Sequence, residues 1–208
     1  MRSSSVFGLV TALSVVAVLA FNGLVPLGQA SPSGPQSPSS AHQASSDGLL
    51  LQLSISGGVV GSGQALFISV DSFNPFGVNL NVSAAKSWAV QGLRTGACPS
   101  SIYPFGVAVY RGDYAAANVS QGQPLRIFPN VPCPLFIRLV TGYNFDPDSS
   151  NATVLPGTGQ AIPISANVTL TGTFPGPGGK AQPLPSGVYT VVAGDEWGAL
   201  VFLQFRVR

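Results

Sequence analysis

Short segments in which apolar and polar residues alternate recur along the chain from residue 49 to the last residue. A period of two places the apolar side chains on one face of an extended strand, and the frequent Val, Ile and Phe residues favour that conformation. No ten-residue stretch has the apolar spacing of a helix, although 84–93 and 114–122 could each form a single helical turn. The pattern predicts strands at residues 49–56, 65–73, 77–83, 105–111, 124–128, 135–142, 161–174, 187–194 and 198–207.

The composition disfavours a helical fold and argues against a nucleic-acid-binding function. The 208 residues include 25 Gly and 18 Pro, which break helices and mark the turns between strands. Only 8% of the residues are charged and the net charge is +2. A nucleic-acid-binding protein needs clustered Lys and Arg to displace counterions, so we expect no nucleic-acid partner. The expected fold is all-β, an antiparallel β-sandwich or barrel.

The C-terminal residues predict a hairpin and carry a resemblance. Strands 187–194 and 198–207 flank the turn Gly194-Asp195-Glu196-Trp197-Gly198. The preceding pattern, Leu-Pro-x-Gly-x-Tyr-x-Val around Tyr189, resembles the penultimate strand of immunoglobulin-like domains, where a Tyr follows a tight turn. It is also similar to a small prokaryotic β-sandwich group named after intracellular proteinase inhibitors. The resemblance covers about twenty-five residues, implies an immunoglobulin-like sandwich and carries no functional residue with it.

The N-terminus has the pattern of an export signal. Arg2 precedes an apolar run from Val6 to Phe21, and small residues, Gly28 and Ala30, stand where a signal peptidase would cut. Extended to Leu27, the apolar stretch has about 22 residues, enough to cross a bilayer if it is retained as an anchor helix. Both outcomes export the remainder of the chain, which is therefore expected to be secreted or held at the cell surface.

Three regions follow from this pattern. Residues 1–30 are the expected signal peptide or membrane anchor, and they are the only expected contact with a membrane. Residues 31–47 are rich in Ser and Pro and are expected to be a disordered linker, because such a segment buries too little apolar surface to fold. Residues 48–208 are the expected β-sandwich domain.

Two features agree with export. The cysteines, Cys98 and Cys133, are expected to form a disulfide, since a lone pair in an oxidising compartment is most simply bonded. A redox or metal-binding pair is disfavoured, because there is no C-x-x-C motif and no nearby His. N-glycosylation sequons (N-x-S/T) begin at Asn81, Asn118, Asn151 and Asn167, and would mark surface positions in a host that glycosylates asparagine.

Candidate chemistry is sparse. The single histidine, His42, lies in the expected linker, so the usual base for a Ser or Cys nucleophile is missing from the folded part. We expect no enzyme activity, no metal site and no cofactor. The acidic turn residues Asp195 and Glu196, with Trp197 beside them, are the expected contact for a partner, against the alternative that this turn is an ordinary hairpin with Trp197 packed on the sheet rim.

These observations predict an exported, non-catalytic interaction or structural domain. Its expected partner is an extracellular protein, a glycan or a second copy of the chain. One alternative is a surface filament subunit, in which residues 49–56 would add a strand to the sheet of the next subunit. Another is a protease inhibitor that uses the Pro-rich segment 128–134 as a rigid loop. A monomer in solution would exclude the filament, and secreted proteases left uninhibited would count against the inhibitor.

Overall fold

The computed structural model describes β-strands and one short 3-10 turn, and no α-helix is present among the residues it describes. The 3-10 turn, η2 (Val119–Gln121), falls within one of the two segments expected to form a helical turn. No helix in this part of the chain is long and apolar enough to cross a membrane. The described residues are 37–208 without 86–87, 91–92, 94–102, 129–139, 158, 172 and 176–180.

Four strands form an antiparallel sheet, here called sheet I. Its order is β1 (Ser39–Ala44), β2 (Leu50–Ile55), β4 (Ala65–Phe73) and β11 (Ser165–Thr171). β2 is paired with β1 on one side and β4 on the other. β11 comes from a distant part of the sequence and runs antiparallel to β4 over seven residue pairs.

Five strands form sheet II. Its order is β3 (Val59–Val60), β15 (Leu200–Val207), β14 (Gly187–Asp195), β6 (Phe105–Arg111) and β7 (Arg126–Phe128). The C-terminal hairpin predicted from the sequence is β14 and β15, paired from Gly187↔Val207 to Gly194↔Leu200. β14 also pairs antiparallel with β6, whereas the short β3 pairs in parallel with β15.

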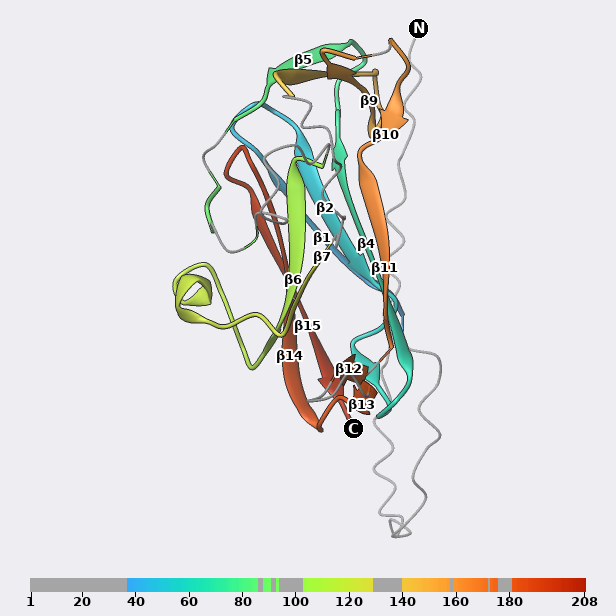
Figure 1. Cartoon of the computed structure of the whole chain (residues 1–208), viewed down its shortest axis with the longest axis vertical. Coiled ribbons are helices and arrows are strands. Elements are labelled where there is room, and N and C mark those ends of the chain that lie inside the picture. Colours follow the sequence, from blue (N-terminus) through green and yellow to red (C-terminus); the bar gives the residue numbers. More distant parts are fainter. Residues whose placement is uncertain are drawn as a thin grey trace, which may run out of the picture. The chain divides into compact units, whose positions relative to one another are not determined.

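A smaller antiparallel sheet is built from segments inserted between the strands of the two main sheets. Its order is β10 (Ile162–Pro163), β9 (Asn151–Leu155), β8 (Gly142–Phe145) and β5 (Leu80–Ser83). Figure 1 shows β5, β9 and β10 at the end opposite the two-stranded pair of β12 (Thr173–Pro175) and β13 (Ala181–Pro183). β9 was not predicted from the sequence, and its burial does not follow a clear period of two.

Sheets I and II share one hydrophobic core. Alternate residues of β2, including Leu51 and Leu53, are buried, and so are alternate residues of β4, including Ile68. They belong to the same buried cluster as Val109 of β6 and Val191 of β14. The alternation that predicted the strands therefore marks the inner face of sheet I, and Figure 1 shows the two layers.

The opposite face of sheet II is covered as well. Val192 of β14 and Tyr110 of β6 belong to a second buried cluster, together with Leu93 and Val119 from the connecting segments. β14 is therefore buried on both faces over most of its length. This explains why its sequence is almost continuously apolar rather than alternating.

The expected linker requires a correction. Residues 39–44 of the segment 31–47 are not disordered but form β1, paired with β2 from Ser39↔Ile55 to Ala44↔Leu50. The strand is polar because it is the edge of sheet I and its side chains are mostly exposed. The backbone of β1 forms hydrogen bonds with β2, and Ala41 packs against the core. A Ser-rich composition therefore does not exclude strand pairing here.

Candidate interaction surface

The turn between β14 and β15 is built around Asp195. Its Oδ1 accepts hydrogen bonds from the backbone N–H groups of Trp197 (3.0 Å) and Ala199 (2.7 Å), which closes the turn. Asp195 is 1% exposed, and its Oδ2 has no hydrogen-bond partner among the described residues. Burial raises the pKa of Asp195 to about 6, the backbone hydrogen bonds oppose that rise, and the charge of Asp47 adds to it.

Trp197 joins this turn to the small sheet. Its Nε1–H donates to the carbonyl of Ser83 in β5 (2.9 Å), and its ring meets Tyr143 of β8 edge-on with centroids 5.7 Å apart. Beside it, Glu196 Oε1 accepts a hydrogen bond from the backbone N–H of Ala85 (3.3 Å). Burial, and then the charge of Glu196, raises the pKa of Tyr143 above its usual range.

The contact turn expected at 195–197 is therefore corrected for two of its three residues. Asp195 and Trp197 are 1% and 2% exposed, so their side chains do not form a surface that a partner could reach. Glu196 is half-buried and engaged with the backbone that follows β5. The turn instead holds the small sheet against sheet II.

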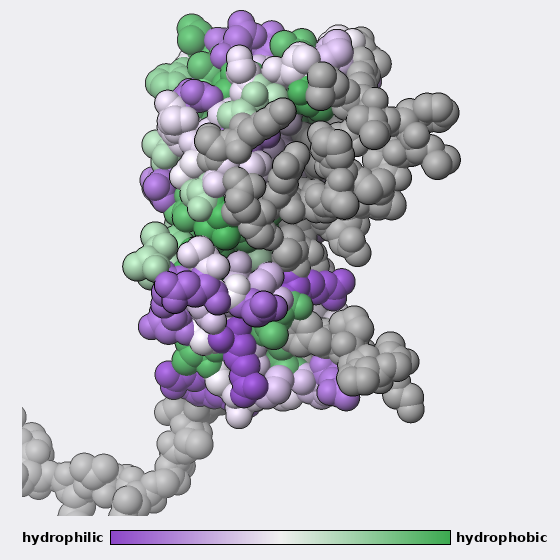
Figure 2. All heavy atoms as spheres, turned by 60° about the vertical axis from the view of Figure 1, so that its left-hand side comes forward, coloured by the Kyte–Doolittle hydropathy of each residue, from purple (hydrophilic) through white to green (hydrophobic). Residues whose placement is uncertain are grey.

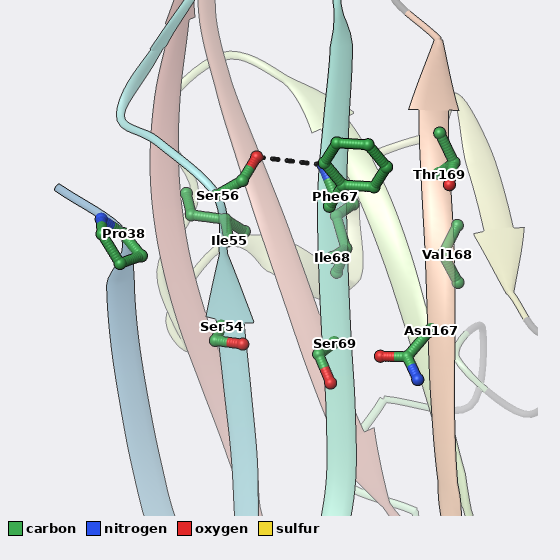
Figure 3. A pocket seen from close by; sticks show the side chains of 10 residues that line it. All are labelled: Pro38, Ser54, Ile55, Ser56, Phe67, Ile68, Ser69, Asn167, Val168 and Thr169. Atoms are coloured by element: carbon green, nitrogen blue, oxygen red, sulfur yellow. Dashed lines mark hydrogen bonds between the residues drawn. The ribbon is translucent and has the colours of Figure 1, made fainter. Parts of the chain in front are cut away.

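The outer face of sheet I is hollowed into a shallow groove of about 360 Å³. Neighbouring strands supply one residue each to a row across this face: Ser40, Ser54, Ser69 and Asn167 are register partners from β1 to β11. In the next row Phe67 of β4 lies opposite Thr169 of β11. Figure 3 shows Ser54, Ser69, Asn167, Phe67 and Thr169, with Asn167 directed towards Ser69. The groove is lined by Pro38, Ser54, Ile55, Ser56, Phe67, Ile68, Ser69, Asn167, Val168 and Thr169.

Phe67 is the aromatic residue among those that line the groove, and it is largely exposed. Its exposed fraction is 59%, and its backbone N–H donates to Ser56 Oγ (3.1 Å). All ten lining residues are uncharged, and six of them carry a hydroxyl, amide or aromatic side chain. Such a surface favours an uncharged ligand that offers hydroxyl groups and an apolar face.

A second hollow of about 220 Å³ continues the same face. It contains the register partners His42, Gln52 and Asp71 from β1, β2 and β4. Ser150 Oγ donates to Asp71 Oδ2 (2.9 Å); burial raises the pKa of Asp71 and this hydrogen bond opposes the rise. His42 and Asp71 lie on either side of β2, so their backbones are two strand spacings apart, about 9–10 Å.

The exposed large apolar side chains of the described residues come from separate segments of the chain, except for Phe76 and Val78, which lie in one connection. On the face seen in Figure 2, polar and apolar residues are interspersed wherever the atoms are not grey. Scattered apolar residues of this kind are normal on a soluble domain. The exposed large apolar side chains are Phe67, Phe76, Val78, Leu125 and Leu155.

All four sequon asparagines are exposed. Asn81 lies in β5, Asn151 begins β9 and Asn167 lies in β11. Asn118 precedes η2, and its Oδ1 accepts a hydrogen bond from the backbone N–H of Ala115 (2.8 Å). The four positions are thus open to an attached sugar.

The remaining candidates from the sequence are the cysteine pair, the inhibitory segment, the donor strand and metal ligands. Cys98 and Cys133 lie outside the described residues, as does the expected inhibitory segment from residue 129 onwards. The expected donor strand 49–56 corresponds to β2, which pairs with β1 and β4 of its own chain. Within the described part of the chain, no three His, Cys, Asp or Glu side chains gather in a way that could hold a metal ion.

Apart from the sequon residue Asn167, the groove residues were not identified from the sequence. The alternation in 65–73 places Phe67, Ser69 and Asp71 on one face, and that signal was present. The strand order that sets Asn167 beside Ser69 depends on pairing across about a hundred residues, which periodicity does not specify.

The comparisons with known proteins identify no family. No family model matches the chain, and no curated protein matches it. Among solved structures, β-glucosidase from Listeria innocua in complex with gluconolactone is similar at 10% identity and a TM-score of 0.32, and the complex with glucose at 13% and 0.30. The matches cover 82% and 76% of this chain but 16% of each β-glucosidase chain. A likeness at this level assigns no activity to the chain.

Proposed function

We propose that this chain is an exported, non-catalytic surface domain with an immunoglobulin-like β-sandwich fold, acting as an interaction or structural module. The strand order supports the fold. In immunoglobulin-like sandwiches the first, second and fifth strands share one sheet, and the third, sixth and seventh share the other. β2, β4 and β11 match the first set, and β6, β14 and β15 match the second. The small sheet is an insertion into this plan.

The observation that carries the fold in this proposal is the hydrogen bond of Tyr189. Its hydroxyl donates to the carbonyl of Pro185, four residues upstream, at 2.6 Å. A Tyr near the start of the sixth strand that bonds back to the backbone a few residues earlier is a hallmark of immunoglobulin-like domains. The ring stacks on Phe205 of β15, with centroids 5.2 Å apart. This pairing fixes the corner where the chain enters β14.

Replacing Tyr189 with Phe should therefore lower the free energy of unfolding by about 0.5–1.5 kcal/mol, because the ring is kept while one hydrogen bond is lost. Urea unfolding followed by fluorescence measures the difference. Tyr114→Phe is the matched control, since Tyr114 is half-buried on the opposite face of sheet II and is expected to change little. Equal effects of the two substitutions would argue against a corner built on Tyr189.

Export is supported by the N-terminal pattern and by the exposure of all four sequon asparagines. Brief treatment of intact source cells with a protease that does not enter them tests it. If the domain is on the surface, peptides should appear from exposed connections such as 112–118, while an intracellular marker protein stays whole. A chain that is cut only after the cells are lysed would contradict export.

A further inference from the structure

The four sequons differ in what surrounds them. Asn167 faces Ser69 across the β4–β11 ladder, and Phe67 is its diagonal neighbour on β4. Diagonal neighbours of this kind lie about 7–8 Å apart, within reach of a group attached to the Asn side chain. Thr169, the hydroxyl residue of the same sequon, lies directly opposite Phe67. The modification sequence and the exposed ring therefore occupy the same groove (Figure 3).

Among the described residues, the register gives the other three positions no such neighbour. The residues opposite Asn81 and Asn151 are Asn144 and Pro163. Asn118 stands before η2 and already accepts a hydrogen bond through its side-chain oxygen. Asn167 is thus the sequon asparagine that the described register sets beside a largely exposed aromatic ring.

We propose that Asn167 carries an N-linked glycan whose first sugars lie in the groove and cover Phe67. A pyranose ring has an apolar C–H face that can stack on an aromatic ring, and hydroxyl groups at its rim that can bond to Ser54, Ser69 and Thr169. The lining is uncharged, which suits a neutral sugar. Covering Phe67 removes apolar surface from water, which stabilises the folded chain.

The attachment needs a donor, which we take to be an oligosaccharide activated on a lipid phosphate. The Asn167 amide nitrogen forms a bond to the anomeric carbon of the sugar. The bond between that carbon and the phosphate oxygen breaks, the phosphate leaves with the electron pair, and the amide loses one proton. Because this transfer acts on exported chains, the inference rests on the proposed export.

The first test is peptide mapping of the chain recovered from the surface fraction of its source. The peptide holding Asn167 should carry a sugar mass, and enzymatic removal in heavy-oxygen water should convert Asn167 to a labelled Asp. An unmodified Asn167 in a surface-exposed chain overturns the glycan and leaves export standing. An unmodified chain found only inside the cell contradicts both proposals.

The second test asks whether the glycan lies on Phe67. Removing it, by enzyme or by Asn167→Gln, should lower the melting temperature of the glycosylated protein by about 3 °C, and by much less when Phe67 is already replaced by Ser. Asn81→Gln is the matched control, and its effect should not depend on Phe67. If Asn167→Gln lowers the melting temperature equally with Phe67 present and with Phe67 replaced by Ser, the placement of the sugar in the groove is overturned.

Discussion

Replacing Asp195 with Asn is expected to remove most of the decline in stability between about pH 4 and pH 7. The folded chain holds a proton on Asp195 up to a pKa of about 6, whereas the unfolded chain releases it near the ordinary value of 3.8. Between these values folding takes up a proton, so the free energy of unfolding falls as the pH rises. The loss reaches about 3 kcal/mol above pH 6, because a buried carboxylate, whose Oδ2 has no hydrogen-bond partner among the described residues, must then be charged.

The Asn side chain keeps the oxygen that accepts from Trp197 and Ala199 and never ionises. The Asp195→Asn variant should therefore be more stable than the wild-type chain at pH 7.5, and the difference in the free energy of unfolding should shrink towards pH 3.5. Urea unfolding at a series of pH values measures this. Asp71→Asn is the matched control. Burial also raises the pKa of Asp71, and the hydrogen bond from Ser150 opposes the rise, so this substitution should change the pH dependence of stability less than Asp195→Asn. If the free energy of unfolding depends on pH in the same way for Asp195→Asn and for the wild-type chain, this explanation is contradicted.

The second large effect is expected at Trp197. Replacing this side chain with Ala should lower the free energy of unfolding by about 3–5 kcal/mol, since it is 2% exposed and leaves a cavity between sheet II and the small sheet. Part of the loss comes from the unpaired carbonyl of Ser83, which receives the indole N–H. Hydrogen exchange should report the loss locally, with the backbone of β5 and β8 losing protection first.

Trp197→Phe separates the two contributions, because it keeps much of the packing on Tyr143 and removes the hydrogen bond. It should cost less than the Ala substitution. Val78→Ala is a matched surface control, since Val78 is 67% exposed and is expected to change stability by less than about 0.5 kcal/mol. A loss at Trp197→Ala no larger than that at Val78 would contradict the junction described here.

The predicted strands were found where the alternation is strong. Residues 65–73 and 105–111 form β4 and β6 with the expected bounds. One face of β4 packs into the core, and β6 is buried on both faces. The C-terminal hairpin was likewise predicted, including its turn. The all-β class with antiparallel sheets followed from these local signals, which depend on neighbouring residues alone.

The turn at 195–197 could not be judged from local signals. Asp-Glu-Trp-Gly has the composition of an exposed hairpin turn, yet Trp197 bonds to Ser83, 114 residues earlier in the sequence. The polar edge strand β1 was missed for a related reason. Its stability comes from backbone pairing with β2 rather than from its own side chains, so a Ser-rich composition predicted disorder instead.

The measurement that tests the central claim most directly is the intact mass and N-terminal residue of the chain recovered from membranes and from the medium. Export predicts a chain in one of these fractions, either starting near Ser31 or retaining residues 1–30 in the membrane. Its mass should be two hydrogens below the reduced value for a bond between Cys98 and Cys133, with added sugar at Asn167. A full-length, reduced and unmodified chain found only inside the cell would contradict the claim.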